Sequence, residues 1–354
     1  MLIIGCDFHP GFQQVAIFDP ETGEIVQQRL AHPQEAVEFY RGLPAGVLVG
    51  IESTGYSGWF ERLLETLGHQ VWVGDALQIR AAMTRKQKTD KRDAEHIVKL
   101  LVEGRFPRVW VPSAADRDAR QLLVHRHKLV QLQTQVKNQL QFLAMNQGLQ
   151  LKWRLWTRSG RQKLEQLPLA PYAAQRRGCL LELLDQLEQQ IARLDAAVLR
   201  EAEARPEAVR LMTHPGVGPV VSLAFVVTLG PAERFAGARQ VASYFGLIPR
   251  ERSSGGRQRL GAISKQGNSF MRYLLVQGGH GAARLDPELR RFYGHCKHTH
   301  AHAGVAKVAV ARKLAVRLYW MLRDRIDYAG LLQRRRSHAG EPESCCGRNL
   351  RPNA

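Results

Sequence analysis

The amino-acid sequence predicts an α/β domain followed by a mainly helical remainder. Strand and helix signals alternate in the first part of the chain, two long helical stretches follow, and the last part is helical around a glycine-rich turn. These three observations indicate an α/β segment, a long-helix segment, a helical carboxyl-terminal segment and a basic disordered tail. The four expected segments are 1–112, 113–206, 207–330 and 331–354.

Five short runs in the first segment predict β-strands, because they are rich in β-branched and aromatic residues and are separated by turn residues. They are LIIGCDF (2–8), QQVAIFD (13–19), GEIVQQRL (23–30), GVLVGIEST (46–54) and HQVWVG (69–74). Apolar spacing predicts three helices. They are PQEAVEFYRGL (33–43), SGWFERLLETLG (57–68) and DKRDAEHIVKLLVEG (90–104). Three successive strands, followed by alternating helices and strands, indicate a mixed sheet covered by helices.

The second segment is long-helical over 115–147 and 171–205. Apolar residues in the second stretch step alternately by four and three positions, which is the spacing of a heptad seam. They are Leu180, Leu184, Leu187, Ile191, Leu194 and Val198. The seam predicts a coiled coil, and its two helices belong either to one chain or to two chains.

A glycine turn opens the helical part of the third segment. In HPGVGPVVSLAFVVTLG (214–230) a Pro-Gly-x-Gly turn enters an apolar helix, as in a helix-hairpin-helix. Such a turn presents backbone N–H groups to a phosphate, although it also serves simply to join two packed helices. Further along, AKVAVARKLAVRLYWML (306–322) is expected to be a basic amphipathic helix.

The charge balance indicates a polyanionic partner. The 354 residues carry 51 Lys and Arg against 32 Asp and Glu, a net charge of +19. Nucleic acid is the commonest partner of so basic a protein, and an anionic membrane surface is the alternative. No run approaches the about 18 apolar residues of a spanning helix, and the amino terminus does not resemble a signal peptide. The five scattered cysteines indicate a reducing compartment, so we expect a cytoplasmic protein.

Four acids are candidate metal ligands. Asp7 and Glu52 end predicted strands, and Asp90 and Asp93 lie three apart in the first turn of a predicted helix. Carboxylates at adjacent strand ends, together with such a helical pair, would suit two magnesium ions about 4 Å apart that polarise a phosphate. Each acid also has a structural explanation, as a turn residue, a strand end or a helix cap.

A second family shares the first motif. The segment IIGCDFHPGFQQVAIFD (3–19) resembles the phosphate hairpin of sugar kinases and actin-like ATPases. That hairpin needs backbone N–H donors after the aspartate, and Pro10 removes one of them. Because no second glycine-rich phosphate loop of that type follows, we set this interpretation aside.

Six motifs in a fixed order resemble one known family. They are Asp7 after the first strand, IESTG (51–55), KTDKRDA (88–94), HPGVGP (214–219), GLIPRERSSGG (246–256) and KQGNSFMRYLL (265–275). Together they closely resemble the insertion-sequence one-ten family of transposases, which are DEDD recombinases guided by a bridge RNA. The resemblance covers residues 1–325 and leaves out the tail.

The resemblance implies a RuvC-like domain of the ribonuclease H fold, a coiled-coil insertion and a carboxyl-terminal transposase domain. It also implies a serine nucleophile that works with a metal-binding acidic tetrad. By motif, the tetrad is Asp7, Glu52, Asp90 and Asp93. The serine lies in SSGG, and we choose Ser254 over Ser253 because Ser254 directly precedes the glycines.

Basic residues near the KTDKRDA and SSGG motifs, and one in KQGNSFMRYLL, are expected to bind nucleic acid. They are Arg85, Lys86, Lys88, Lys91, Arg92, Arg250, Arg252, Arg257, Arg259 and Arg272. No base lies next to Ser254 in the sequence, so activation of its hydroxyl must come from the acidic site of another domain or subunit. Without the family, a flexible polar loop with arginines on a solvated face would be the preferred explanation of this segment.

The combined prediction is a DNA transposase of a bacterial insertion sequence, cutting and rejoining DNA through a covalent serine-phosphate intermediate. Two Mg²⁺ ions, donor and target DNA, a non-coding guide RNA and a homo-oligomer, either a dimer or a tetramer, are the expected partners. We expect the protein to associate with the nucleoid and not with a membrane. A RuvC-like Holliday-junction nuclease and a non-catalytic nucleic-acid-binding protein remain as alternatives.

Overall fold

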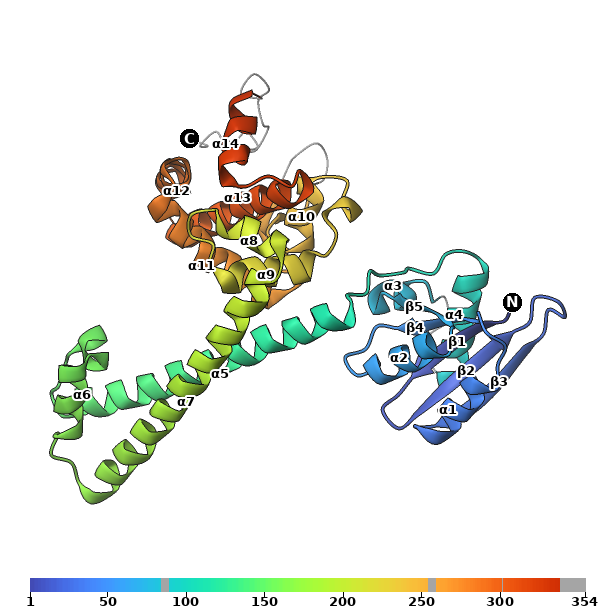
Figure 1. The fold of residues 1–354 in the computed structure, drawn as a ribbon, viewed down its shortest axis with the longest axis horizontal. Coiled ribbons are helices and arrows are strands. Elements are labelled where there is room, and N and C mark those ends of the chain that lie inside the picture. Colours follow the sequence, from blue (N-terminus) through green and yellow to red (C-terminus); the bar gives the residue numbers. More distant parts are fainter. Residues whose placement is uncertain (84–88, 254–258, 301, 338–354) are drawn as a thin grey trace. The chain divides into compact units, whose positions relative to one another are not determined.

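The structure, a computed structural model, forms two compact units, Met1–Val111 and Pro112–Ala354 (Figure 1). The described residues are 1–83, 89–253, 259–300 and 302–337. An α/β unit is followed by a mainly helical one, which confirms the coarse fold class. The expected segments 113–206 and 207–330 both lie in the second unit.

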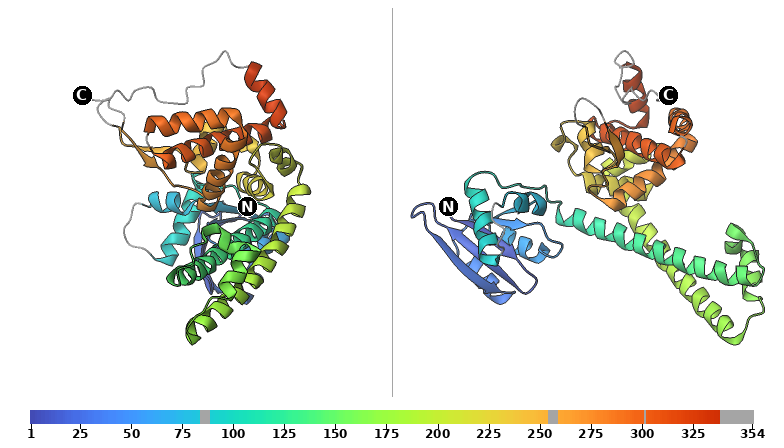
Figure 2. Two further views of the ribbon diagram at one scale, coloured as in Figure 1. Left: turned by 90° about the vertical axis from the view of Figure 1, so that its left-hand side faces the viewer. Right: turned by 180° about the vertical axis from the view of Figure 1, so that it is seen from behind.

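A mixed sheet forms the centre of the first unit, with the strand order β3-β2-β1-β4-β5 (Figures 1 and 2). Its strands are β1 (Ile3–Phe8), β2 (Phe12–Phe18), β3 (Ile25–Ala31), β4 (Leu48–Glu52) and β5 (Gln70–Gly74). The first three strands pair antiparallel, whereas β4 runs parallel to β1 and β5 runs parallel to β4. The carboxyl ends of β1 and β4 therefore lie at the same end of the sheet.

Helices cover both faces of this sheet. They are α1 (Gln34–Arg41), α2 (Gly58–Thr66), α3 (Ala76–Ala81) and α4 (Asp90–Val102). Successive side chains of a strand point to opposite faces. Ile4, Cys6 and Phe8 of β1 accordingly share an apolar cluster with Tyr40 of α1 and Phe60 of α2. The other face of β1 packs against α4.

Two paired glycines allow α4 to lie close against the sheet. Gly5 of β1 is the register partner of Gly50 of β4. A Cβ added at Gly5 would lie 2.3 Å from the carbonyl oxygen of Ala94 and 2.7 Å from the backbone nitrogen of Val98, both in α4. A Cβ at Gly50 would lie 2.7 Å from the side chain of Leu101. The approach of α4 to the end of β1 therefore depends on these glycines.

We expect Gly5→Ala to lower the free energy of unfolding by about 2 kcal/mol, because the backbone of α4 would have to move. Gly50→Ala should cost less, since the Leu101 side chain can rotate away. Gly55→Ala is the control, because nothing lies within 4 Å of a Cβ there. Denaturant unfolding of the three variants measures the difference. Equal stability of Gly5→Ala and Gly55→Ala would show that the close approach is unimportant.

The second unit begins with two long antiparallel helices, α5 (Ala114–Asn146) and α7 (Pro171–Glu203) (Figure 1). Arg126 pairs with Asp195, and Lys137 pairs with Glu188. The residue numbers of the two helices therefore increase in opposite directions, as in an antiparallel pair. Between them lie η1 (Lys152–Trp156) and α6 (Arg158–Glu165). Most of the heptad seam shares an apolar cluster with α5. The seam therefore pairs within the chain, which answers the question that the sequence left open.

The remaining elements of this unit follow α7, and the turn predicted from HPGVGP lies among them. They are α8 (Pro206–Met212), α9 (Pro219–Leu229), η2 (Ala232–Arg234), α10 (Ala238–Tyr244), β6 (Pro249–Glu251), β7 (Leu260–Ile263), α11 (Ser269–Leu285), α12 (Pro287–His300), α13 (Ala303–Arg323) and α14 (Tyr328–Ser337). The turn joins α8 to α9, and Gly216 within it has a positive φ of 82°. A Cβ at Gly216 would lie 2.3 Å from the backbone nitrogen of Ala282, so both conformation and packing require glycine.

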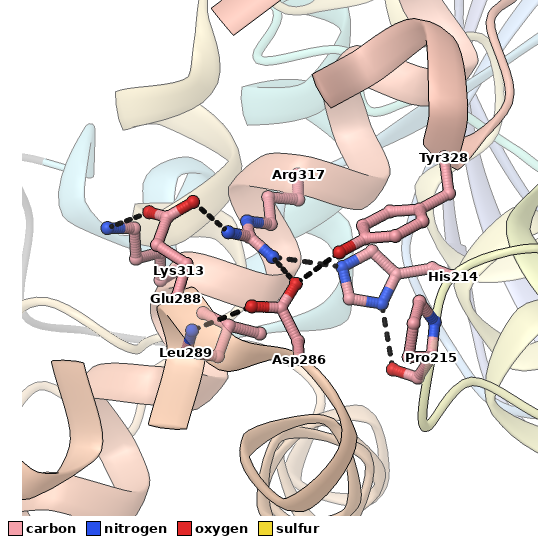
Figure 3. A network of polar contacts seen from close by, with 8 residues as sticks. All are labelled: His214, Pro215, Asp286, Glu288, Leu289, Lys313, Arg317 and Tyr328. Atoms are coloured by element: carbon pink, nitrogen blue, oxygen red, sulfur yellow. Dashed lines mark hydrogen bonds and ion pairs between the residues drawn. The ribbon is translucent and has the colours of Figure 1, made fainter. Parts of the chain in front are cut away.

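A buried polar network ties this turn to the later helices (Figure 3). The side chain of Arg317 in α13 is 3% exposed and donates to Asp286 and to Glu288, each at 2.7 Å. Asp286 also accepts a hydrogen bond from the Tyr328 hydroxyl. An Arg317 nitrogen lies 3.4 Å from His214 Nε2, while His214 Nδ1 lies 2.9 Å from the carbonyl of the next residue. This arrangement suits a neutral His214 ring that accepts at Nε2 and donates at Nδ1.

The network makes the stability of the second unit dependent on pH. Burial lowers the pKa of His214 to about 4, and the Arg317 cation also lowers it. The unfolded ring takes up a proton below about pH 6.5, whereas the folded ring resists it. Stability that is present above pH 6.5 is therefore lost as the pH falls toward 4.

From His214 alone, we expect the free energy of unfolding to fall by about 2 kcal/mol between pH 7 and pH 5. Denaturant titrations at the two pH values measure this change. His214→Gln should lose this part of the pH dependence, because no ring remains to titrate. His298→Gln replaces an exposed histidine of α12 and should behave as the wild type. An unchanged dependence in His214→Gln would contradict the assignment.

Candidate active site

The predicted acids lie at the carboxyl ends of two parallel strands and in the first turn of α4. Asp7 is in β1 and Glu52 ends β4, each two residues after one of the glycines beneath α4. The two-residue period of a strand therefore directs both side chains to the face that α4 covers. The helix begins at Asp90 because the Thr89 side chain accepts a hydrogen bond from the backbone N–H of Arg92.

Three possible ligand atoms come together at this end of the sheet. His9 Nε2 lies 3.1 Å from Asp7 Oδ2 and 3.8 Å from Asp90 Oδ1. Ligand atoms of all three residues lie within 4.8 Å of one another. The side chains of Asp7, His9 and Asp90 are 15%, 34% and 47% exposed, so a ligand can reach them from solvent. Among the described side chains, neither Glu52 nor Asp93 belongs to such a group.

Neighbouring acids affect the electrostatics of Asp7. Burial raises the pKa of Asp7, and the negative charges of Asp93 and Asp90 raise it further. His9 acts in the opposite direction, through its charge and its hydrogen bond. Carboxylates that repel one another favour a bound cation, so this arrangement suits a divalent metal ion.

Sequence reasoning missed His9. The interpretation of the DFHP motif considered only the missing N–H donor of Pro10. A usable signal was present, however, because residues two apart at the end of a strand point to the same face. His9 is two residues after Asp7, and its ring does lie beside that carboxylate.

The predicted serine segment lies between the two strands of a hairpin. β6 and β7 pair antiparallel, and the backbone N–H of Arg252 donates to the carbonyl of Arg259 at 2.9 Å. The Ser253 hydroxyl donates to Glu251 at 2.6 Å and accepts from the Arg259 backbone N–H at 3.2 Å. Ser254 lies outside the described residues.

Comparison with known proteins identifies the family. A family model described as "Transposase IS116/IS110/IS902 family" matches residues 208–294, and a "Transposase" model of the DEDD IS110 type matches residues 4–144. The "Probable family 20 transposase" of Pseudomonas aeruginosa is 32% identical over 337 residues, covering 91% of this chain and 96% of the relative. The chain belongs to the IS110 family of transposases. The resemblance seen in the sequence is thereby confirmed.

Other relatives of this transposase carry the same kind of name. The "Transposase for insertion sequence element IS1328" of Yersinia enterocolitica is 27% identical, over 90% of this chain and 96% of the relative. The "Transposase for insertion sequence element IS1111A" of Coxiella burnetii is 25% identical, over 80% of this chain and 78% of the relative. The family membership makes the chain a DNA-cleaving and rejoining enzyme of an insertion sequence.

The expected nucleic-acid ligands of the transposase differ in their surroundings. Lys91, Arg250, Arg252 and Arg259 are exposed, and Arg92 is half-buried. Arg272 is half-buried and donates to the backbone carbonyls of Gln266 and Gly267, so it holds the start of α11 in place. Arg85, Lys86, Lys88 and Arg257 lie outside the described residues. Within the described ranges, no helix is long and apolar enough to cross a membrane.

Proposed function

We propose that this transposase cuts and rejoins DNA through a covalent Ser254–phosphate intermediate, assisted by divalent metal ions at Asp7, Glu52, Asp90 and Asp93. The observation that carries the proposal is the convergence of Asp7 and Asp90 at the ends of β1 and α4, in a chain of the DEDD transposase family. Burial raises the pKa of Asp7, and the charges of Asp93 and Asp90 raise it further, which also supports the proposal.

The proposal includes a fold assignment for the first unit and one for the two long helices of the second unit. The strand order β3-β2-β1-β4-β5, with β2 antiparallel to both of its neighbours, supports a RuvC-like ribonuclease H fold for the first unit. The ion pairs and the apolar seam between α5 and α7 support an antiparallel coiled coil.

The residues fit a hard divalent cation. Carboxylate oxygens are the ligands that Mg²⁺ prefers, and the half-exposed site leaves room for water and a phosphate oxygen. We propose two Mg²⁺ ions, held by Asp7 and Asp90 with Asp93 and Glu52 nearby. When bound, they would supply charge stabilisation to the phosphate that reacts.

The residues of the chain carry the rest of the chemistry. The Ser254 hydroxyl attacks a DNA phosphate, a bond from its oxygen to phosphorus forms, and one phosphodiester bond breaks. The serine proton passes to a base in an acidic site supplied by another domain or subunit, and the departing DNA hydroxyl takes up a proton. Arg250, Arg252 and Arg259 hold the phosphate as its charge grows. Rejoining reverses these steps and needs no ATP, because the serine–phosphate ester conserves the free energy of the broken phosphodiester bond.

We further propose a non-coding guide RNA and a homo-oligomeric complex, either a dimer or a tetramer, acting at the nucleoid. The net charge of +19 supports simultaneous binding of DNA and RNA. A subunit whose acidic site serves the serine of a partner would also explain why no base adjoins Ser254 in the sequence.

The proposal is tested by reconstitution. Purified protein, donor and target DNA, RNA transcribed from the flank of the element and Mg²⁺ should together produce recombinant junctions. Removing Mg²⁺ with EDTA or omitting the RNA should abolish them. Recombination without RNA would remove the guide from the proposal. Cleavage without rejoining would favour the Holliday-junction nuclease, and binding without cleavage would favour the non-catalytic protein.

A further inference from the structure

His9 lies inside the acidic group without being one of its four acids. Its Nε2 atom lies 3.1 Å from Asp7 and 3.8 Å from Asp90, so this nitrogen faces both carboxylates. A cation between the two carboxylates would be within reach of the nitrogen. The imidazole of His9 thus occupies the position of a third ligand.

The hairpin between β1 and β2 holds this ring in place. The backbone N–H of His9 donates to the carbonyl of Phe12 at 2.9 Å, which closes the turn. The His9 ring stacks on the Phe12 ring at a centroid distance of 4.6 Å and an interplanar angle of 22°. The guanidinium of Arg29 lies 3.8 Å from the centroid of the Phe12 ring and further restrains it. A ligand that is already oriented loses little entropy when a metal ion binds.

The chemistry of the ligands separates two roles for His9. As an ion-pair partner only, the ring would neutralise Asp7 and would be displaced when a cation arrived. As a ligand, the neutral ring would stay and contribute a nitrogen to an otherwise oxygen-based site. Imidazole suits transition metals, whereas Mg²⁺ and Ca²⁺ favour oxygen ligands. The ring is held by the Phe12 stack in addition to its hydrogen bond with Asp7, and the stack favours the second role.

We propose that His9 is a nitrogen ligand of the divalent ion held by Asp7 and Asp90, and that it biases the site toward Mn²⁺ over Ca²⁺. This inference rests on the metal site of the proposed function. It adds a fifth residue to the four acids of the proposed site, and it gives the Phe12 stack the role of orienting the His9 ring.

Binding of Mn²⁺ to the full-length protein tests the inference without any activity measurement. Electron spin-echo spectroscopy of bound Mn²⁺ should show coupling to an imidazole ¹⁴N nucleus, which should change on labelling histidine with ¹⁵N. His9→Gln should remove this coupling and weaken Mn²⁺ binding by about tenfold or more, with less effect on Ca²⁺. His96→Gln is the matched control on α4, because His96 Nε2 is bonded to the carbonyl of Ile79. This control should keep the coupling.

The outcomes distinguish the inference from the function on which it rests. A ¹⁴N coupling that persists in His9→Gln, or unchanged Mn²⁺ affinity, would overturn the role of His9. Asp7→Asn serves as the reference for the site itself. If Asp7→Asn loses Mn²⁺ while His9→Gln keeps it, only the histidine inference fails. If Asp7→Asn binds Mn²⁺ as the wild type does, the proposed metal site fails as well.

Discussion

Ser254→Ala is expected to abolish the covalent protein–DNA adduct and to reduce strand exchange by on the order of 10³-fold or more. The substitution removes the proposed attacking oxygen and no charge, so DNA and RNA binding should persist. The free energy of unfolding should change by less than about 0.5 kcal/mol. Trapping the adduct on a nicked suicide substrate with Mg²⁺ measures the effect directly.

Ser253→Ala is the matched control for this experiment. Its hydroxyl is already engaged, donating to Glu251 and accepting from the backbone of Arg259 across the hairpin. The variant should therefore loosen the hairpin and retain adduct formation. If Ser253→Ala lost the adduct and Ser254→Ala kept it, the nucleophile would move by one residue. Full activity of both would favour a nuclease that uses the acids alone.

Asp7→Asn is expected to lower strand cleavage by on the order of 10³-fold, because the amide loses the charge that would attract a divalent ion. The protein should stay folded. Because burial and the neighbouring acids raise the pKa of Asp7, its ionised form opposes folding near pH 7. Removing the charge should therefore leave the stability undiminished or raise it. Cleavage assays and denaturant unfolding of the same preparation measure both effects.

Asp19→Asn controls for the loss of one carboxylate from the first unit. Asp19 follows β2, and its side chain accepts a hydrogen bond from the backbone N–H of Glu21. This variant should cleave DNA at the wild-type rate. If Asp7→Asn cleaved as well as Asp19→Asn, the acidic site would have no part in the reaction. If Asp7→Asn simply unfolded, its lost activity would say nothing about metal binding, and Asp90→Asn, at a half-exposed position, would decide the matter.

Local sequence patterns were sufficient to predict the five strands of the first unit approximately, but not β6 and β7 of the second unit. The β-branched and aromatic composition of runs such as LIIGCDF, and the turn residues between them, depend only on neighbouring residues. The structural explanation of Asp90 as a helix cap was wrong, because Thr89 caps α4 and Asp90 is its first residue. The placement of Asp7 and Glu52 at strand ends followed from the same patterns, and the order of motifs was enough to recognise the family. Period-four and period-three spacing likewise predicted α5 and α7, although it left their partner open.

The tertiary structure decided what depends on residues far apart in the chain. The expected basic amphipathic helix is α13. Its Arg317 is buried against Asp286, which follows the last residue of α11, and the helical period alone does not indicate this ion pair. Gly5 and Gly50 are ordinary strand residues until α4 lies over them. The strand period already indicates that His9 lies beside Asp7, but His9 becomes a candidate ligand only because α4 brings Asp90 to the same end of the sheet. Sequence periodicity reports the face on which a side chain lies, whereas the distance between two faces is set by packing, which local sequence does not encode.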